Sequence, residues 1–119
     1  YPDEKPIIPH GLSVIINAPA VFKFTFESNP ERHLNAASLM DSDELSSNDK
    51  PGEILSSKII SLLRNLNMPN GLQELGYNHD DIPKLVEATL PQHRVTKLSP
   101  LKVGTKELEG LFSDSMSLW

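Results

Sequence analysis

Apolar residues recur at three- and four-residue intervals in every patterned block of this 119-residue sequence. This spacing places them on one face of an α-helix, and no block shows the convincing two-residue alternation of a half-buried strand. The clearest stripe lies between Pro51 and Pro69, and it consists of Leu55, Ile59, Leu62, Leu63 and Leu66. Pro51 suits the start of this helix, and Pro69 with Gly71 stops it. The periodicity therefore predicts an all-α fold.

The block that begins near His10 differs because its apolar residues do not keep to one face. Leucine and isoleucine form one side, and the other sides carry Val14, Ala18 and Val21. A helix that is apolar on all sides is normally buried, so we expect this helix to be the most buried one, with a kink or break at Pro19. Two alternatives remain for the three small residues: they are core, or their exposed sides form an apolar patch that meets a partner.

Polar residues mark where further helices begin. Asn29, followed by proline and glutamate, can cap a short helix that runs to about Met40. Either Asn78 or Asp80 can cap a later helix. The last helix is expected to begin near Thr105.

Two segments connect these helices. Residues 41–50 are serine-rich and unpatterned, and residues 92–104 carry basic side chains without a helical stripe, so both are predicted to be loops. About five helices with short connections indicate a helical bundle. We expect the whole chain, residues 1–119, to form a single helical domain.

The composition excludes several classes of function. The chain has 11 Lys and Arg against 16 Asp and Glu, a net charge of -5, which argues against nucleic acid as a partner because phosphates attract basic residues. There is no cysteine, so disulfides, thiolate nucleophiles and cysteine-based zinc sites are excluded. The longest mainly apolar stretch, residues 12–22, is shorter than the roughly 20 residues that a membrane-spanning helix needs. No basic membrane-binding run and no targeting segment is visible.

Histidines are the first residues to consider for chemistry. The chain has four, and no two are spaced to place two metal ligands on one helix face: His10, His33, His79 and His93. A lone histidine is usually a surface or packed residue. His10 differs because it stands between Pro9 and Gly11, at the start of a helix expected to be buried. An imidazole there needs a partner, and either a metal ion or a backbone carbonyl would supply one.

Short motifs give this chain a resemblance to a known family. Pro9-His10-Gly11 followed by an apolar helix resembles the last metal-ligand segment of iron-containing alcohol dehydrogenases, and Gly76-Tyr77 with Asp81-Ile82-Pro83 resembles a later segment. One branch of that family, the hydroxyacid-oxoacid transhydrogenases, is similar over further segments. These include Pro30-Glu31-Arg32-His33-Leu34 and Arg94-Val95-Thr96-Lys97-Leu98, and the second is the most specific motif of all.

The resemblance implies a larger two-domain enzyme, of which this chain is the carboxyl-terminal helical part without the amino-terminal nucleotide-binding domain. Family members hold a divalent iron with one Asp and three His, and only the last His maps here, onto His10. The resemblance further implies that the full-length enzyme binds iron(II) or zinc together with NAD, transfers hydride from 4-hydroxybutyrate to 2-oxoglutarate, and is mitochondrial. The chain by itself is expected to hold no cofactor and to be inactive. Its partners would be the nucleotide-binding domain and the small hydroxyacid and oxoacid substrates, and a homo-oligomer stays open.

Arg94 and Lys97 are the candidate substrate-binding residues, and no catalytic residue is assigned in this chain. They are the only close basic pair in the most specific motif. Arginine can offer two parallel hydrogen bonds to a carboxylate, with lysine as a supporting charge, so we expect them to hold the distal carboxylate of 2-oxoglutarate. The alternative is a solvated basic loop, or a salt bridge to acidic residues elsewhere in the domain. Two other functions also stay open: an ordinary NAD-dependent iron or zinc alcohol dehydrogenase, and a non-catalytic helical interaction module.

Overall fold

The long helices lie where the periodicity predicts them, and every regular element in the described part of the chain is helical. The computed structural model describes residues 8–40 and 50–119, so the predicted arm before residue 8 and most of the predicted loop at 41–50 lie outside it. The elements are α1 (His10–Thr25), η1 (Phe26–Ser28), α2 (Pro30–Leu39), η2 (Pro51–Glu53), α3 (Ile54–Asn65), α4 (Gly71–Glu74), η3 (His79–Asp81), α5 (Ile82–Thr89), α6 (His93–Thr96) and α7 (Thr105–Asp114). The expected all-α fold is confirmed.

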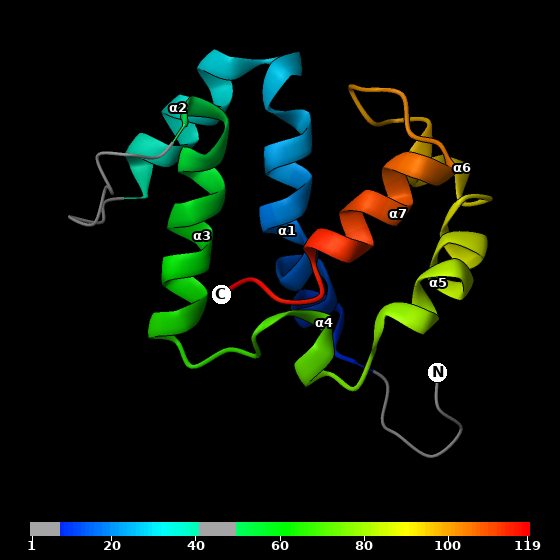
Figure 1. Ribbon diagram of the computed structural model, residues 1–119. Helices are drawn as coiled ribbons and strands as arrows, with labels where there is room; N and C mark the ends of the chain where they lie inside the picture. Colours follow the sequence, from blue (N-terminus) through cyan, green and yellow to red (C-terminus); the bar gives the residue numbers. More distant parts are fainter. Residues whose placement is uncertain (1–7, 41–49) are drawn as a thin grey trace.

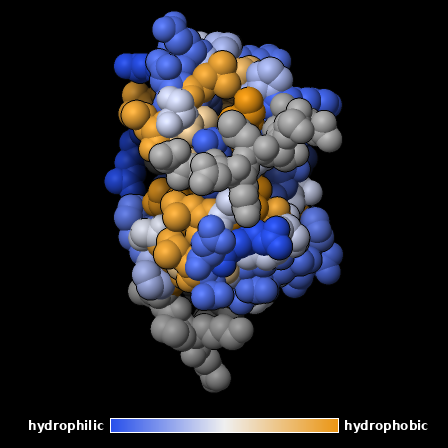
Figure 2. Space-filling view, turned by 90° about the vertical axis from the view of Figure 1, so that its left-hand side faces the viewer, coloured by the Kyte–Doolittle hydropathy of each residue, from blue (hydrophilic) through white to orange (hydrophobic). Residues whose placement is uncertain are grey.

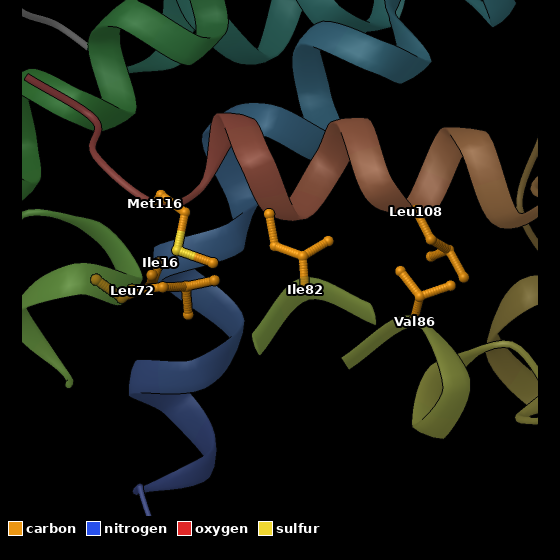
Figure 3. Packing of buried hydrophobic residues seen from close by; sticks show 6 residues of the cluster. All are labelled: Ile16, Leu72, Ile82, Val86, Leu108 and Met116. Carbon is orange, nitrogen blue, oxygen red and sulfur yellow. The ribbon is translucent and has the colours of Figure 1, made fainter. Parts of the chain in front are cut away.

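The central helix is α1, which packs against α3 on one side and against α7 on another (Figure 1). Two hydrophobic clusters flank it. The first cluster consists of Ile16, Leu72, Ile82, Val86, Leu108 and Met116 (Figure 3). The second cluster consists of Ala37, Leu55, Ile59 and Leu63 on α2 and α3. Because Ile16 belongs to the first cluster and Ile15 packs against the second, α1 connects the two halves of the molecule.

The expectation that α1 is the most buried helix is wrong. Its buried residues are Ile16, Pro19, Ala20 and Thr25, whereas the shorter α3 buries Leu55, Ser56, Lys58, Ile59 and Leu63. No described element covers the remaining face of α1, on which Val14 is 54% and Val21 38% exposed. The alternative of a break at Pro19 is also wrong, because α1 is continuous through it. A proline removes one backbone donor. Here the ring of Pro19 is fully buried, and the helix continues through it.

Local hydrogen bonds fix the start of α2 and the end of α3. The side chain of Asn29 accepts a hydrogen bond from the backbone N–H of Arg32 (N···O 3.1 Å), which confirms the predicted cap. After α3 the chain passes through Asn67 in the left-handed region (φ 52°). The backbone N–H of Met68 then donates to the carbonyl of Leu63 (2.9 Å), as in a Schellman motif. This turn ends α3 just before the predicted proline stop.

The predicted stripe of α3 is only partly buried. Leu55, Ile59 and Leu63 lie in the second cluster, but Leu62 and Leu66 are 44% and 61% exposed. In Figure 1, α2 lies beside the beginning of α3, whereas the two exposed leucines belong to its last turn and to the residue that follows it. Figure 2 shows the side formed by α2 and α3, where apolar groups reach the surface between polar ones.

The second half of the chain confirms most of the predicted helices, decides between the two candidate caps and corrects one predicted loop. Asn78 rather than Asp80 is the cap: its side chain accepts from the N–H of Asp80 (2.8 Å), and the carboxylate of Asp81 accepts from the N–H of Asn78 (2.9 Å). The last helix begins at Thr105, as predicted. The predicted loop at 92–104 contains the four-residue helix α6. A single turn is too short to leave a periodic pattern in the sequence.

Candidate metal-binding site

His10 is the first residue of α1, and its side chain is exposed. Two hydrogen bonds hold the backbone around it. The N–H of Ser13 donates to the carbonyl of Pro9 (3.0 Å), and the hydroxyl of Ser13 donates to the carbonyl of His10 (2.8 Å). The expected burial of this helix start is wrong, because Pro9, His10 and Gly11 are all exposed. Within residues 8–40 and 50–119 the imidazole has no hydrogen-bond partner, so its nitrogens are accessible to a ligand that approaches from outside.

A single imidazole fits a metal site as one ligand of a larger set. In the part of the chain that the structure describes, no group of three or more His, Asp or Glu side chains is placed to hold a metal ion. Iron and zinc both accept imidazole nitrogen, but a catalytic site needs several protein ligands. The donor at His10 is therefore suitable, and the remaining ligands would have to come from elsewhere.

The other histidines have different environments. His33 engages both ring nitrogens: Nε2 lies 3.0 Å from the hydroxyl oxygen of Thr25, and Nδ1 lies 2.8 Å from the carbonyl oxygen of Asn29. It fastens α1 to the start of α2 and has no nitrogen left for a metal. His79 and His93 are exposed, on η3 and α6.

The exposed apolar side of α1 continues the face on which His10 lies. Residues four, seven and eleven positions apart share one face of an α-helix, so His10, Val14, Asn17 and Val21 lie along one side. Val14 and Val21 are 54% and 38% exposed, and Ala18 beside them is partly buried. The alternative that Val14, Ala18 and Val21 are all core residues is therefore wrong. An uncovered apolar stripe next to an exposed imidazole is a surface that can receive another protein segment.

Arg94 and Lys97 are not brought together with His10. Arg94 lies on α6, Lys97 follows it, and both side chains are exposed. Neither forms an ion pair with another residue of the described ranges. In Figure 1, α6 lies beside the start of α7, whereas the first turn of α1 lies nearer the end of α7. The first turn of α1 and α6 therefore lie toward opposite ends of α7 (Figure 1).

A groove between α1 and α7 contains none of these candidates. It is lined by Ala20, Lys23, Phe24, Lys106, Glu107, Gly110, Leu111 and Asp114. Two of its charged groups are already engaged. The ammonium of Lys23 lies 3.2 Å from the carboxylate of Glu53, and Glu107 accepts a hydrogen bond from the N–H of Gly104 (2.8 Å). The groove therefore adds no binding residue to the site around His10.

The sequence does not predict the contacts of Asn70, and it indicates Gly71 only as part of the stop after the third helix. The Asn70 side chain bonds the backbone of Leu118 and Trp119, and Gly71 (φ 76°) lies against the Met116 carbonyl. An Asn-Gly pair signals a turn. It does not reveal which segment, 49 residues away, the asparagine contacts.

Comparison with known proteins relates this chain to one family. Residues 7–116 match the model described as the Fe-containing alcohol dehydrogenase family, C-terminal. The chain is 53% identical to the probable hydroxyacid-oxoacid transhydrogenase, mitochondrial, of Dictyostelium discoideum, with all of the chain covered. It is 48% and 42% identical, again over its whole length, to the proteins named hydroxyacid-oxoacid transhydrogenase, mitochondrial, of Xenopus tropicalis and Homo sapiens. It spans 22%, 26% and 26% of these three relatives, about a quarter of their length.

No solved structure matches the chain significantly. Among the residues that the structure places, no helix has both the length and the apolar character needed to cross a membrane. The family match includes the exposed His10 and continues through α7 to Met116. This chain belongs to the Fe-containing alcohol dehydrogenase family and corresponds to the carboxyl-terminal region of its members.

Proposed function

We propose that this chain forms the carboxyl-terminal helical domain of a mitochondrial hydroxyacid-oxoacid transhydrogenase. The complete enzyme would transfer hydride from 4-hydroxybutyrate to 2-oxoglutarate through bound NAD. Relatives named for this activity and for mitochondria support the proposal, and each extends far beyond the region that this chain covers. The structural observation that carries it is the exposed imidazole of His10 beside an uncovered apolar face of α1.

His10 is the residue of this chain that would hold the metal. One ring nitrogen suits iron(II) or zinc, and the other is available to a partner that orients the ring. The two hydrogen bonds made by Ser13 fix the backbone from which the imidazole extends. A divalent ion bound there would stabilise negative charge on the substrate oxygen as a Lewis acid. The contribution of this chain is the placement of one ligand.

The remaining ligands and the NAD site would belong to an amino-terminal nucleotide-binding domain. That domain must approach His10 to complete the metal site, and the same face of α1 exposes Val14 and Val21. Covering these side chains would stabilise the contact by about 25 cal/mol for each Å² of apolar surface buried. Because one imidazole does not complete a metal site, we expect residues 1–119 to be inactive by themselves.

Replacement of His10 in the full-length protein that contains this chain tests the proposal. His10→Ala is expected to lose bound metal and hydride transfer together, because both depend on the same ligand. His79→Ala is the matched control, since His79 is also exposed and has no side-chain hydrogen bond to another described residue. Elemental analysis measures metal content, and a coupled assay with 4-hydroxybutyrate and 2-oxoglutarate measures transfer. Normal metal content in His10→Ala would refute the ligand role.

The substrates separate this proposal from an ordinary alcohol dehydrogenase. A transhydrogenase keeps its nicotinamide bound and requires an oxoacid acceptor, whereas a dehydrogenase releases the reduced cofactor. Turnover of a simple alcohol with free NAD, together with no transfer between the two acids, would favour the dehydrogenase. A full-length protein that binds neither metal nor NAD would favour the helical interaction module.

We also propose that Arg94 and Lys97 bind the distal carboxylate of the oxoacid. Both are exposed cations without an ion-pair partner in the described residues, and a guanidinium can hold a carboxylate by two hydrogen bonds. Because α6 and the first turn of α1 lie toward opposite ends of α7 (Figure 1), binding by both requires a substrate position that reaches both ends of α7, or a movement of α6 in the complete enzyme.

A further inference from the structure

We infer that residues 115–119, the clamped segment, position His10, and that Asn70 is the residue that holds this segment. The inference rests on the proposed metal role of His10. The Oδ1 atom of Asn70 accepts hydrogen bonds from the backbone N–H groups of Leu118 (2.7 Å) and Trp119 (3.0 Å). Its Nδ2 atom donates to the carbonyl of Trp119. One side chain therefore fastens two consecutive residues of the clamped segment.

The backbone that follows Asn70 adds a second set of hydrogen bonds. The N–H of Leu72 donates to the carbonyl of Ser115 (2.9 Å), and the N–H of Gln73 donates to the carbonyl of Met116 (3.1 Å). Residues 70–73 thus form hydrogen bonds with both the beginning and the end of the clamped segment. This attachment does not depend on any residue of α1.

Met116 carries the attachment to α1. Its side chain is 1% exposed and lies in the first cluster with Ile16, which is 0% exposed, and Leu72. Figure 3 shows the three side chains together at one end of the cluster. Leu12, two residues after His10, packs against the same cluster. A displacement of Met116 would therefore loosen the turns of α1 that follow the metal ligand.

Apart from the clamped segment, the first turn of α1 is held by the two hydrogen bonds that Ser13 makes to the carbonyls of Pro9 and His10. No side chain caps the helix at Pro9, and residues 9–11 are exposed. On the other side of α1, Leu118 and Ile15 pack against the second cluster. The clamped segment thus touches both clusters that flank the turns after His10. A metal ligand must be held within about 0.5 Å of its working position, so these contacts affect how tightly the metal binds.

Two alanine substitutions in the first cluster test this inference in the full-length protein. Met116 and Leu108 are both buried, and Figure 3 places Leu108 beside Val86, at the other end of the cluster from Ile16. Each substitution leaves a core cavity, but only Met116→Ala loosens the contact with α1. Titration of the metal-free protein with Fe²⁺ or Zn²⁺ is expected to give about tenfold weaker binding for Met116→Ala, the lower end for residues that orient a ligand. Leu108→Ala is expected to bind as wild type does.

Circular dichroism at the titration temperature checks that each variant is folded. The measured dissociation constants of the metal then do not reflect a general loss of stability. Equal weakening by Met116→Ala and Leu108→Ala would overturn the inference, because the cluster would then act only through overall stability. Wild-type affinity in both would overturn it as well.

A second pair of variants tests the clamp itself. Asn70→Ala removes its side-chain bonds and is expected to weaken metal binding about tenfold. Asn65→Ala is the matched control, because Asn65 is exposed at the end of α3 and has no side-chain hydrogen bond to another described residue. If His10→Ala keeps normal metal content, the proposed function fails and this inference fails with it. If His10→Ala loses the metal while Asn70→Ala and Met116→Ala bind it normally, only the positioning inference fails.

Discussion

Replacing Gly71 with alanine is expected to destabilise the chain through two separate effects. Gly71 has φ 76°, in the left-handed region, where another residue type costs roughly 1–2 kcal/mol. A Cβ atom at this position would lie 2.4 Å from the carbonyl oxygen of Met116 and 2.7 Å from that of Ser115. Both contacts are with backbone atoms, so no side chain can turn away to make room. The clamped segment would have to move instead.

That movement would break the hydrogen bonds on either side of the clash. The bonds from Leu72 to Ser115 and from Gln73 to Met116 each contribute about 0.5–1.5 kcal/mol. Together with the backbone strain, the expected loss in the free energy of unfolding is roughly 2–5 kcal/mol. A domain of 119 residues has a total stability of about 6–18 kcal/mol. The substitution would therefore remove a large fraction of it.

Urea unfolding of the 119-residue chain, followed by circular dichroism, measures this loss. Gly110→Ala is the matched control because Gly110 lies inside α7 and a Cβ atom there meets nothing within 4 Å. Alanine favours the helix at that position, so this variant is expected to gain about 0.5–1 kcal/mol. A Gly71→Ala chain whose stability lies within about 0.5 kcal/mol of wild type would refute the argued contact with the clamped segment.

Three further predictions concern other parts of the chain. Asn29→Ala is expected to lose the cap of α2 and about 1 kcal/mol of unfolding free energy in the same urea assay, and an unchanged value would contradict the bond to Arg32. Ile16→Ala is expected to cost roughly 2–5 kcal/mol because Ile16 is 0% exposed, whereas Val14→Ala, at a residue 54% exposed, should change stability by less than about 0.5 kcal/mol. Equal losses for these two would mean that the outer face of α1 is covered in solution. In the full-length protein, Arg94→Ala is expected to lower kcat/KM for 2-oxoglutarate. The fall should correspond to a loss of about 1.5–3 kcal/mol in transition-state stabilisation, with metal content and activity on uncharged alcohols spared. An equal loss for both substrate types, or none, would leave Arg94 without the proposed role.

Helix positions could be predicted from the sequence because the interactions that start and stop a helix act within a few residues. The side chain of Asn29 accepts from an amide three positions further on. Asn78 accepts from the N–H of Asp80 and donates its own N–H to the carboxylate of Asp81. The inner face of α5 also follows from local spacing, since its buried residues Ile82 and Val86 lie four positions apart. The candidate metal ligand is local in the same sense, because the motif that singles out His10 spans only its two neighbours.

Only the tertiary structure decided which side of α1 is buried and what holds its first turn. Apolar residues on every side of α1 give the sequence no preferred inner face, and the packing of α3 and α7 leaves Val14 exposed. The hydrogen bond between Asn70 and Trp119 joins positions 49 residues apart, and only the packing of the helices brings α6 and the first turn of α1 toward opposite ends of α7 (Figure 1). A helical period records only the direction of side chains around their own axis, whereas burial depends on which surfaces meet when the helices pack.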